Sequence, residues 1–384
     1  MRYHLFLVNS VSLLIGISYG IHNPILPIFA VDSIGASYSD LGAIGVANFM
    51  PYVFVPLFVG MLLDKFNRGW ILTVGVAINV VSTYALSIVH TVPEIIICRI
   101  GTGIAHAFFW PPCEAIISSV SSGADRVKNI AKFVGFFVAG FTIGPLLGSL
   151  FLNDSDSGYR LLFQFAAFVM AAALISSVST SRIRTVASSV KISLSGFRSL
   201  ISLPEMVLML IYCTASFGVI LAIYPAFLTE KGTSAMHVEI LYFVFGISRI
   251  ITLICAKKFV GHVTIILVAS ILSIGIGMSA AYFGNGLFWY AIALLTMGFG
   301  FSAIVPLTLE IALSRAKAKM SGSVIGAYES IFGIGWVIGP IIAGIVSQEY
   351  GGSAPYIVFA IFGFGVAFIA IARRSVLQPI YRQD

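Results

Sequence analysis

Long stretches without a charged residue recur along this 384-residue chain; residues 5–29 and 263–309, for example, contain no Asp, Glu, Lys or Arg. Hydrophobic residues make up 59% of the chain and charged residues only 10%, whereas about a quarter of the residues in a soluble domain are charged. A folded interior cannot cover so much apolar surface. Lipid must therefore cover part of it, and the sequence predicts a polytopic membrane protein.

The apolar stretches have the length of membrane-spanning helices. A helix needs about 20 apolar residues to cross the hydrocarbon, because each residue advances it by only about 1.5 Å. Period-two alternation is absent from the sequence, so a membrane β-barrel is not expected. The first stretch carries Pro24 and Pro27 and lacks a small-residue cleavage pattern, which favours a span over a signal peptide. The twelve predicted spans are 5–29, 40–63, 70–89, 94–119, 130–152, 160–179, 204–228, 238–256, 263–283, 286–313, 322–347 and 354–372.

Lys and Arg are unevenly distributed between the predicted loops. With both termini in the cytoplasm, 18 of the 22 basic residues lie on the inner side. The outer loops keep Arg160 and Lys231, while Arg99 and Arg249 fall within spans. Since inner loops attract basic residues, we expect a plasma-membrane protein with cytoplasmic N- and C-termini. The net charge of +7 follows from this placement, so no nucleic-acid partner is expected.

Residue patterns typical of enzymes and metal proteins are missing from the sequence. The four cysteines lie in predicted spans without CxxC spacing, which predicts neither a disulfide framework nor a metal site. No GxxxxGK[ST] loop and no Ser/His/Asp constellation occurs, so neither ATP-driven transport nor intramembrane catalysis is expected. We expect a non-enzymatic protein that needs no cofactor and draws on the proton gradient.

The two halves of the chain repeat one another in outline. The stretch YGIHNPILPIF (19–29) aligns with FGVILAIYPAF (217–227), and GFTIGPLLGSL (140–150) aligns with GWVIGPIIAGI (335–345). We predict an N-terminal six-helix bundle over 1–179, a polar, Ser-rich cytoplasmic linker over 180–203 and a C-terminal bundle over 204–384. Such duplicated transporters bind their substrates where the two halves meet.

Three motifs resemble signatures of the major facilitator superfamily. GMLLDKFNRGW (60–70) resembles the signature of the loop between spans 2 and 3, and RIGTGIAHA (99–107) resembles that of span 4. GFTIGPLLGS (140–149) resembles the Gly-Pro signature of span 5 in proton-coupled exporters of the family. The resemblance covers the whole chain and implies an all-α fold of 12 transmembrane helices in two pseudo-symmetric six-helix bundles. It also implies a transporter that works as a monomer.

The loop motif departs from the family pattern at two positions. Asn67 replaces the loop glycine and Gly69 replaces a basic residue. Because Asn tolerates a left-handed backbone, we expect the turn to survive. In the second half, the matching stretch around Lys257 and Lys258 has lost its acidic residue.

The resemblance implies that the loop motif acts as a gate. It places Asp64 beside the start of span 11, where unpaired N–H groups of residues 321–323 present partial positive charge. Asp64 would then stabilise the closed cytoplasmic face, and Arg68 would pair with an acid of the neighbouring bundle. The alternative is that these charges serve topology alone. The predicted gating residues are Gly60, Asp64, Lys65 and Arg68.

Span 4 carries a stripe of polar and aromatic side chains. Arg99, Gly103, His106 and Trp110 stand at i, i+4, i+7 and i+11, with Glu114 beside them on the helix surface. Such a stripe avoids lipid, so it faces a cavity or another helix. For Arg99 the alternative is a structural bond to span 1 carbonyls. His106 either binds substrate or a proton, or only forms a hydrogen bond within its half.

Span 1 is expected to be broken at Pro24, with polar side chains at the break. Broken helices line the sites of many transporters, although a packing kink with a satisfied histidine is the alternative. The candidates for the substrate cavity here are Tyr19, His22, Asn23 and, from the matching stretch of the second half, Tyr224.

The second half adds three ionisable residues within or near its spans, namely Arg249, Glu310 and Glu329. An Arg–Glu pair between these helices would be switchable, so we expect Arg249 to approach Glu329. A carboxyl that exchanges protons must change its charge during transport, and the nearly uncharged surroundings of Glu329 suit that role. Glu329 is the first candidate for the proton site, and Glu114 is the second.

Small residues in spans 5 and 11 predict close helix packing. The packing positions are Gly140, Gly144, Pro145, Gly148, Gly339 and Pro340.

Three functions are compatible with the sequence. The first is a secondary exporter that exchanges small amphipathic compounds for protons, favoured by the Gly-Pro motif and by a lightly charged interior with 31 Phe and 15 Tyr. The second is an uptake carrier for a sugar, organic acid or other nutrient, with Arg99, Arg249 and His106 as ligands. The third is a non-transporting receptor or scaffold, which would be expected to carry a large soluble extension.

Overall fold

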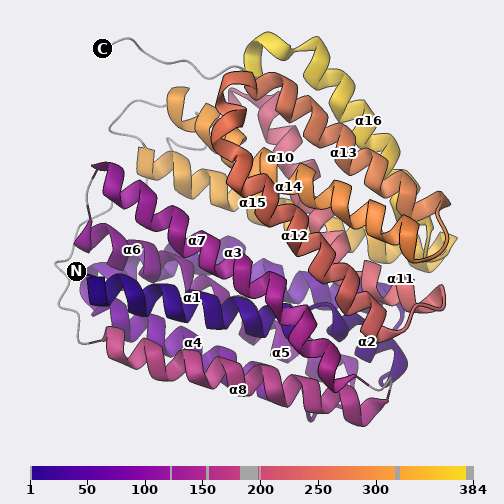
Figure 1. Cartoon of the computed structure of the whole chain (residues 1–384), viewed down its shortest axis with the longest axis horizontal. Coiled ribbons are helices and arrows are strands. Elements are labelled where there is room, and N and C mark those ends of the chain that lie inside the picture. The colour runs from indigo at the N-terminus through magenta and orange to yellow at the C-terminus, as the bar shows by residue number, and fades with distance from the viewer. Residues whose placement is uncertain are drawn as a thin grey trace.

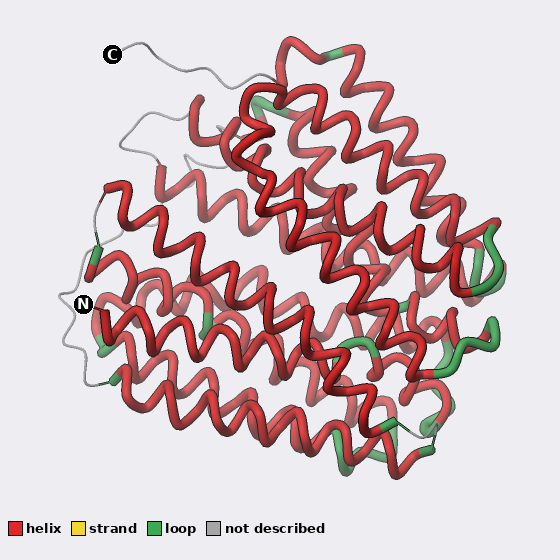
Figure 2. The backbone as a smooth tube through the Cα atoms, in the orientation of Figure 1, coloured by secondary structure: helices red, strands yellow, loops and turns green. Residues whose placement is uncertain are grey.

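The computed structural model describes residues 2–121, 123–152, 155–181, 198, 200–315 and 321–377. Over these ranges every regular element is a helix, and no strand occurs (Figure 2). Ten helical runs in the described chain are long and apolar enough to cross a membrane. The predicted all-α membrane fold is confirmed.

Within the described residues, the first half comprises eight α-helices and one short 3₁₀ helix. Of the predicted spans, 40–63 and 70–89 correspond to α3 and α4, which are not among those ten runs; α3 packs against α5 and α15, and α4 against α5 and α8. The elements are α1 (Arg2–His22), α2 (Ile25–Asp32), α3 (Tyr38–Lys65), α4 (Arg68–Ala85), α5 (Val92–Ala107), α6 (Trp110–Val120), α7 (Gly123–Gly148), η1 (Ser149–Phe151) and α8 (Asp156–Thr180).

The described residues after the predicted linker form seven α-helices and two short 3₁₀ helices. Residues 182–197 of the predicted linker lie outside the described ranges, and the predicted boundaries of the two bundles remain a prediction. The elements are α10 (Pro204–Ala222), α11 (Tyr224–Glu230), α12 (Ala235–Phe259), η2 (Val260–His262), α13 (Val263–Phe283), α14 (Leu287–Arg315), α15 (Ser321–Tyr350), α16 (Ala354–Ala372) and η4 (Arg374–Leu377).

Three predicted spans are each split into two helices. The first is interrupted at Asn23 and Pro24, between α1 and α2, and the seventh at Ile223, between α10 and α11. Proline disfavours helical backbone in the residue before it and has no N–H to donate, so Pro24 and Pro225 explain these breaks. The fourth is interrupted after Ala107, ahead of Pro111.

The helices of the two halves lie side by side and meet along two seams. In Figure 1 the N-terminal half occupies the lower part of the view and the C-terminal half the upper part. The seams are formed by α3 with α15 and by α7 with α12. The described chain begins with α1 at one end of the molecule, and α2 meets α11 at the opposite end (Figure 1).

Glycines bring α7 into backbone contact with α1. A Cβ atom on Gly144 would lie 2.5 Å from the Ile17 carbonyl oxygen, and one on Gly140 would collide with the Leu13 carbonyl. Pro145 lies against Gly20 at the same seam. The second half repeats the arrangement, because Gly339 abuts Ala215 of α10. Small residues here set the distance between the helices.

Several contacts join the halves near the end formed by α2 and α11. Pro340 of α15 packs against Gly42 and Gly45 of α3, and the Tyr38 hydroxyl donates to Glu230. On the other seam a Cβ on Gly148 would lie 2.6 Å from the Glu239 carboxyl. This end is therefore closed by contacts between the halves.

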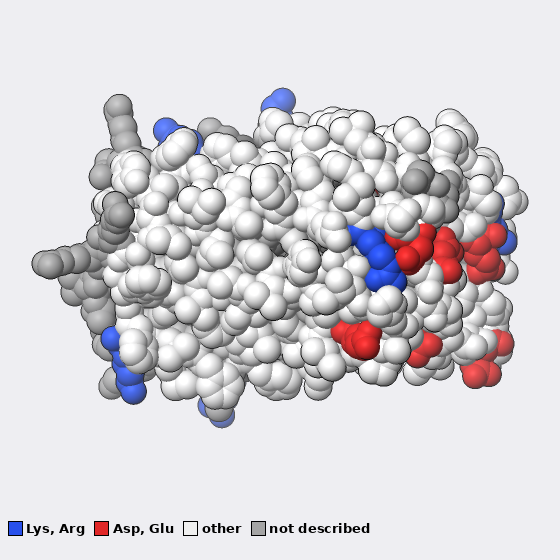
Figure 3. Space-filling view, turned by 90° about the horizontal axis from the view of Figure 1, so that it is seen from below, with Lys and Arg blue, Asp and Glu red and all other residues white. Residues whose placement is uncertain are grey.

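Charges on the surface are separated along the length of the helices. Figure 3 shows acidic side chains toward the end away from the termini, basic ones mostly toward the other end, and a broad uncharged band between them. One ion pair at the acidic end joins Arg160 to Asp156 at 2.7 Å. An uncharged band of this kind suits the hydrocarbon of a bilayer.

Candidate substrate and proton site

His106 of α5 lies where side chains from both halves converge. Its ring centroid is 5.6 Å from that of Tyr19 (α1), 5.3 Å from Tyr52 (α3), 6.3 Å from Phe137 (α7) and 6.4 Å from Trp336 (α15). The Trp110 Nε1–H donates to His106 Nε2 at 2.8 Å. Because this nitrogen accepts a hydrogen bond, it carries no proton, and His106 is neutral here.

The rings continue from Trp336 into the second half. Phe49 lies 4.7 Å from Trp336 between ring centroids, Phe217 lies 5.9 Å away, and Phe332 lies 4.9 Å away. Phe217 stacks on Phe301 at 4.0 Å. We call this set the central aromatic cluster; its members are Tyr19, Phe49, Tyr52, His106, Trp110, Phe137, Phe217, Phe301, Phe332 and Trp336.

Two carboxyl groups, one from each half, lie beside the cluster. Glu329 of α15 is half-buried and accepts a hydrogen bond of 3.0 Å from the Tyr52 hydroxyl. Glu114 of α6 has an exposed side chain and lies within electrostatic range of Glu329 and Tyr52. Two neighbouring carboxylates repel each other, so a proton or a cation bound between them relieves the repulsion.

Arg249 is held by aromatic rings. Its guanidinium carbon lies 5.7 Å from the Phe141 centroid, 5.2 Å from Phe217, 5.6 Å from Phe245 and 5.2 Å from Phe301. The expected pair between Arg249 and Glu329, two residues that the structure describes, is not formed. The ring faces attract the buried cation instead, and Phe141 closes the cage from the other half of the molecule.

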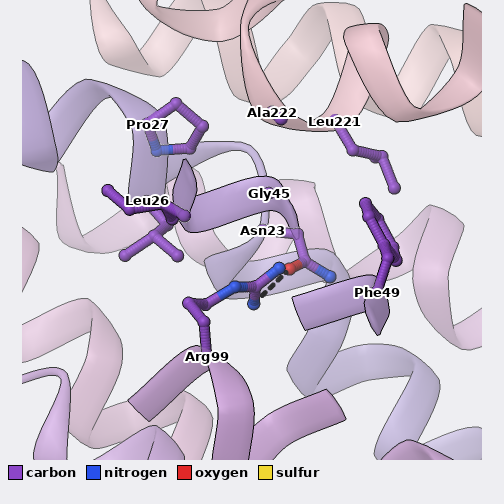
Figure 4. A pocket seen from close by; sticks show the side chains of 9 residues that line it. Asn23, Leu26, Pro27, Gly45, Phe49, Arg99, Leu221 and Ala222 are labelled. Atoms are coloured by element: carbon purple, nitrogen blue, oxygen red, sulfur yellow. Dashed lines mark hydrogen bonds between the residues drawn. The ribbon is translucent and has the colours of Figure 1, made fainter. Parts of the chain in front are cut away.

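Arg99 lies beside the break in the first span. Its Nη1 donates to the Asn23 side-chain oxygen at 3.1 Å (Figure 4). This bond runs to a side chain rather than to one of the span 1 carbonyls considered from the sequence. The two residues line a small pocket whose other walls are Leu26, Pro27, Ile44, Gly45, Phe49, Leu221 and Ala222.

Two other candidates of the first span are held by bonds within the N-terminal half. The Tyr19 hydroxyl accepts from Asn79 at 2.9 Å, and its ring packs against His22 as well as His106. His22 is fully buried, with Nδ1 2.7 Å from the Ser18 carbonyl oxygen on the same helix. His22 Nε2, however, has no hydrogen-bond partner among the described residues, so the histidine is not fully satisfied and its role remains a prediction.

Two candidates lie apart from the central aromatic cluster. Tyr224 is buried within the second half, with its ring 6.1 Å from Phe227 and 5.3 Å from Tyr356 between centroids. Glu310 is half-buried near the end of α14. The structure does not bring either residue to the rings around His106.

The loop motif is only partly described. The side chains of Asp64 and of residues 321–323 lie outside the described set, so the contact between them remains a prediction. Arg68 is buried and donates to the Ala115 carbonyl oxygen at 2.8 Å, within its own half. Lys65 and Gly60 are exposed.

The two departures in this motif have local explanations. Asn67 has φ −63° and ψ 123°, so the expected left-handed conformation is wrong. Its side chain instead caps α4 by accepting from the backbone N–H groups of Gly69 at 2.8 Å and Trp70 at 3.3 Å. A Cβ on Gly69 would collide with Thr180, so glycine lets α4 approach α8.

Several residues of the site were missed from the sequence. Tyr52, Phe49 and Trp336 are ordinary aromatic residues of apolar spans, and nothing local distinguishes them from other rings. Away from this site, the buried Glu239 of α12 was also missed, although an acidic residue within a predicted span marks a candidate functional position.

Comparisons with known proteins agree with this architecture. The profile of the Major Facilitator Superfamily matches residues 8–340. Quinolone resistance protein NorA of Staphylococcus aureus (strain MRSA252) is 26% identical over 181 residues, a match that spans 46% of each protein. The matched part is thus about half the length of that relative. Multidrug resistance protein 1 of Bacillus subtilis (strain 168) is 27% identical over 300 residues, or 75% of each.

Solved structures share the fold. The nucleoside transporter NupG superposes with a TM-score of 0.77 at 15% identity, covering 97% of this chain and 99% of that one. A bacterial homolog of the human lysosomal transporter Spinster, in an inward-facing and occupied conformation, also gives 0.77 at 15% identity and covers 100% and 99%. At these identities the likeness concerns the fold alone.

Proposed function

The chain belongs to the major facilitator superfamily, and from this premise we propose that it exports small amphipathic compounds across the plasma membrane in exchange for protons. It is a multi-pass membrane transporter and not an enzyme. The direction of transport, the coupling to protons and the class of substrate are the parts proposed here.

The observation that carries the proposal is the pairing of aromatic rings with two carboxyl groups where the halves meet. Flat rings such as Trp336 and Phe217 offer stacking surfaces to planar organic compounds. Ring faces and carboxylates both attract cations. A lipophilic cation bound beside Glu114 and Glu329 would thus replace the proton that otherwise relieves their repulsion.

This competition would couple the movement of substrate to the movement of protons. Substrate and proton cannot both neutralise the same carboxyl, so arrival of one favours release of the other. Coupling also requires that the two ligands favour different conformations. Tyr52 and Glu329 supply such a contact, because their 3.0 Å hydrogen bond joins α3 of one half to α15 of the other. A change of charge on Glu329 alters that contact directly.

Two basic residues of the site support this arrangement. His106 accepts from Trp110 and is neutral, so it adds no positive charge that would repel a cation. Arg249 is enclosed by four phenylalanine rings and stays apart from Glu329. Neither residue therefore competes with a substrate cation for the two carboxyl groups. The names of the two relatives refer to drug resistance, which supports export as the direction of transport.

An uptake carrier is a second candidate, and the pocket in Figure 4 is the observation that favours it. Arg99 lines this pocket, and its Nε has no hydrogen-bond partner among the described residues. A hydroxylated or anionic nutrient would be a suitable ligand for such a group.

The test uses purified protein in lipid vesicles that contain a pH-sensitive dye. The panel holds planar lipophilic cations, neutral aromatics, sugars and organic acids. We expect the cations to be moved against their gradient with opposite proton flux. Replacing Trp336 by Leu should reduce this flux, whereas Trp289→Leu, at an exposed tryptophan of α14, should not. Flux of sugars or acids in the same direction as protons would instead support the uptake carrier.

A further inference from the structure

A buried carboxyl group lies at the second seam between the halves. Glu239, in the second turn of α12, is fully buried. It faces the end of α7, where a Cβ on Gly148 would lie 2.6 Å from its Oε1. Neither carboxyl oxygen has a hydrogen-bond partner within the described part of the chain. This residue belongs neither to the central aromatic cluster nor to the pair formed by Glu114 and Glu329.

The surroundings of Glu239 provide no positive charge. The part of α7 and η1 at this end, residues 133–151, contains no charged residue, and neither does α14 over 287–309. On its own helix, Tyr242 donates to the Ile220 carbonyl instead, and His237 is exposed and bonded to Ser234. Tyr242 lies within electrostatic range of both Glu239 and Tyr224, and neither tyrosine carries positive charge.

Helices α2 and α11, which contact α12, carry acids at their ends that are bonded elsewhere. Asp32 accepts from the Tyr159 hydroxyl at 3.0 Å, and Glu230 accepts from Tyr38. Among the described residues, then, no group supplies the bonds or the countercharge that an ionised Glu239 would need. A buried carboxylate without either is strongly disfavoured relative to the neutral acid.

We propose that Glu239 is a second proton-binding site, which takes up a proton when α7 and α12 close together and releases it when they separate. The inference rests on the proposed function in one respect, since it requires the halves to alternate. In the closed seam, the neutral acid fits among uncharged neighbours. Once the seam opens, water reaches the carboxyl and stabilises its ionised form.

The sign of the pH dependence follows. Low pH on the side to which this seam opens favours the protonated, closed seam, and high pH favours the open one. For release of a single proton, the ratio of open to closed seam rises by at most about tenfold per pH unit. The proton returns to the side from which it came. Glu239 therefore controls the opening of the α7–α12 seam. Its proton does not cross the membrane, unlike the proton bound by Glu329, and so does not count toward the number of protons exchanged per substrate.

Distances across the seam provide the test. Spin labels on cysteines at Leu150 and Met236, both exposed at this end, report its opening in full-length protein in lipid. The four native cysteines are replaced by alanine. Between about pH 5 and about pH 8.5, the wild type should shift from short to long distances, within the limit of about tenfold per pH unit. Glu239→Gln should remain short throughout.

The control variant is Glu349→Gln, which removes an exposed acid of α15 and should retain the wild-type shift. Glu239→Asp keeps a carboxyl and should also retain a pH-dependent shift. A wild type whose distances ignore pH overturns the inference, as does a normal shift in Glu239→Gln. Vesicle transport is measured separately. A pH-dependent seam without substrate export would remove the proposed function alone, and export with a pH-independent seam would remove this inference alone.

Discussion

Replacing Gly144 by alanine should destabilise the protein by forcing α7 away from α1. The new Cβ would lie 2.5 Å from the Ile17 carbonyl oxygen and 2.6 Å from the Gly20 Cα, about 1 Å closer than an ordinary contact. Both neighbouring atoms belong to the backbone, so no side-chain rotation relieves the clash. Overpacking of this kind costs about 1–3 kcal/mol.

Gly135→Ala is the matched control. It lies on the same helix, and a Cβ there meets nothing within 4 Å. Both substitutions gain the same helix propensity, about 0.5–1 kcal/mol. The difference between the two variants therefore isolates the overpacking.

Thermal unfolding in detergent, followed by size exclusion or tryptophan fluorescence, measures this difference. We expect Gly144→Ala to unfold about 1 to 4 °C below Gly135→Ala, because the entropy of unfolding scales with chain length and a chain of 384 residues loses about 1.2 °C per kcal/mol. Equal or reversed transition temperatures would refute the close approach of α1 and α7 on which the estimate depends.

Three further predictions concern topology and gating. In protein without native cysteines, single cysteines at Ser155 and Ser353 should react with an impermeant reagent added from outside, and one at Ser188 should not. Labelling at Ser188 alone would contradict cytoplasmic termini. Asp64→Asn should shift the population toward an open cytoplasmic face several-fold, because a contact with a helix N-terminus contributes about 0.3–1 kcal/mol. Spin-label distances between the cytoplasmic ends of α3 and α15 measure this shift. Unchanged distances would leave topology as the only role of the Asp64 charge. Tyr52→Phe removes one hydrogen bond of about 0.5–1.5 kcal/mol. It should raise the ratio of open to closed α3–α15 seam about two- to tenfold in the same distance measurement. An unaltered ratio would show that the bond does not hold the halves together.

Helix positions and the break in the first span could be predicted because their causes are local. Hydropathy over about 20 residues identifies a span, and Pro24 acts on the backbone next to it. The breaks in the fourth and seventh spans were not predicted. The presence of a Gly-Pro packing segment in each half could also be predicted, because the two segments repeat in the sequence. These features need no knowledge of which helices are neighbours.

The site itself depends on helix rotation and tilt, which the sequence does not encode locally. His106 could be placed on an inward stripe, but Tyr52 and Trp336 join it only because α3 and α15 meet there. Arg249 was expected to approach Glu329. It faces four rings instead, one of them from α7, a neighbour that could not be deduced from α12 alone.

Asn67 illustrates a different reason for error. Its position in a glycine-type turn suggested a left-handed backbone, yet the same residue type is a preferred helix N-cap. The outcome depends on where α4 begins. Since α4 starts at Arg68, the capping role prevails.

The most direct test of proton-coupled export is the flux of Glu329→Gln compared with wild type in the same vesicles. Glutamine keeps the shape of the side chain but cannot exchange a proton. We expect this variant to lose accumulation of substrate driven by a pH gradient while retaining part of its downhill or exchange flux, which shows that the protein is intact. Normal accumulation with normal pH dependence in Glu329→Gln would contradict the role of Glu329 and transfer it to Glu114 or His106.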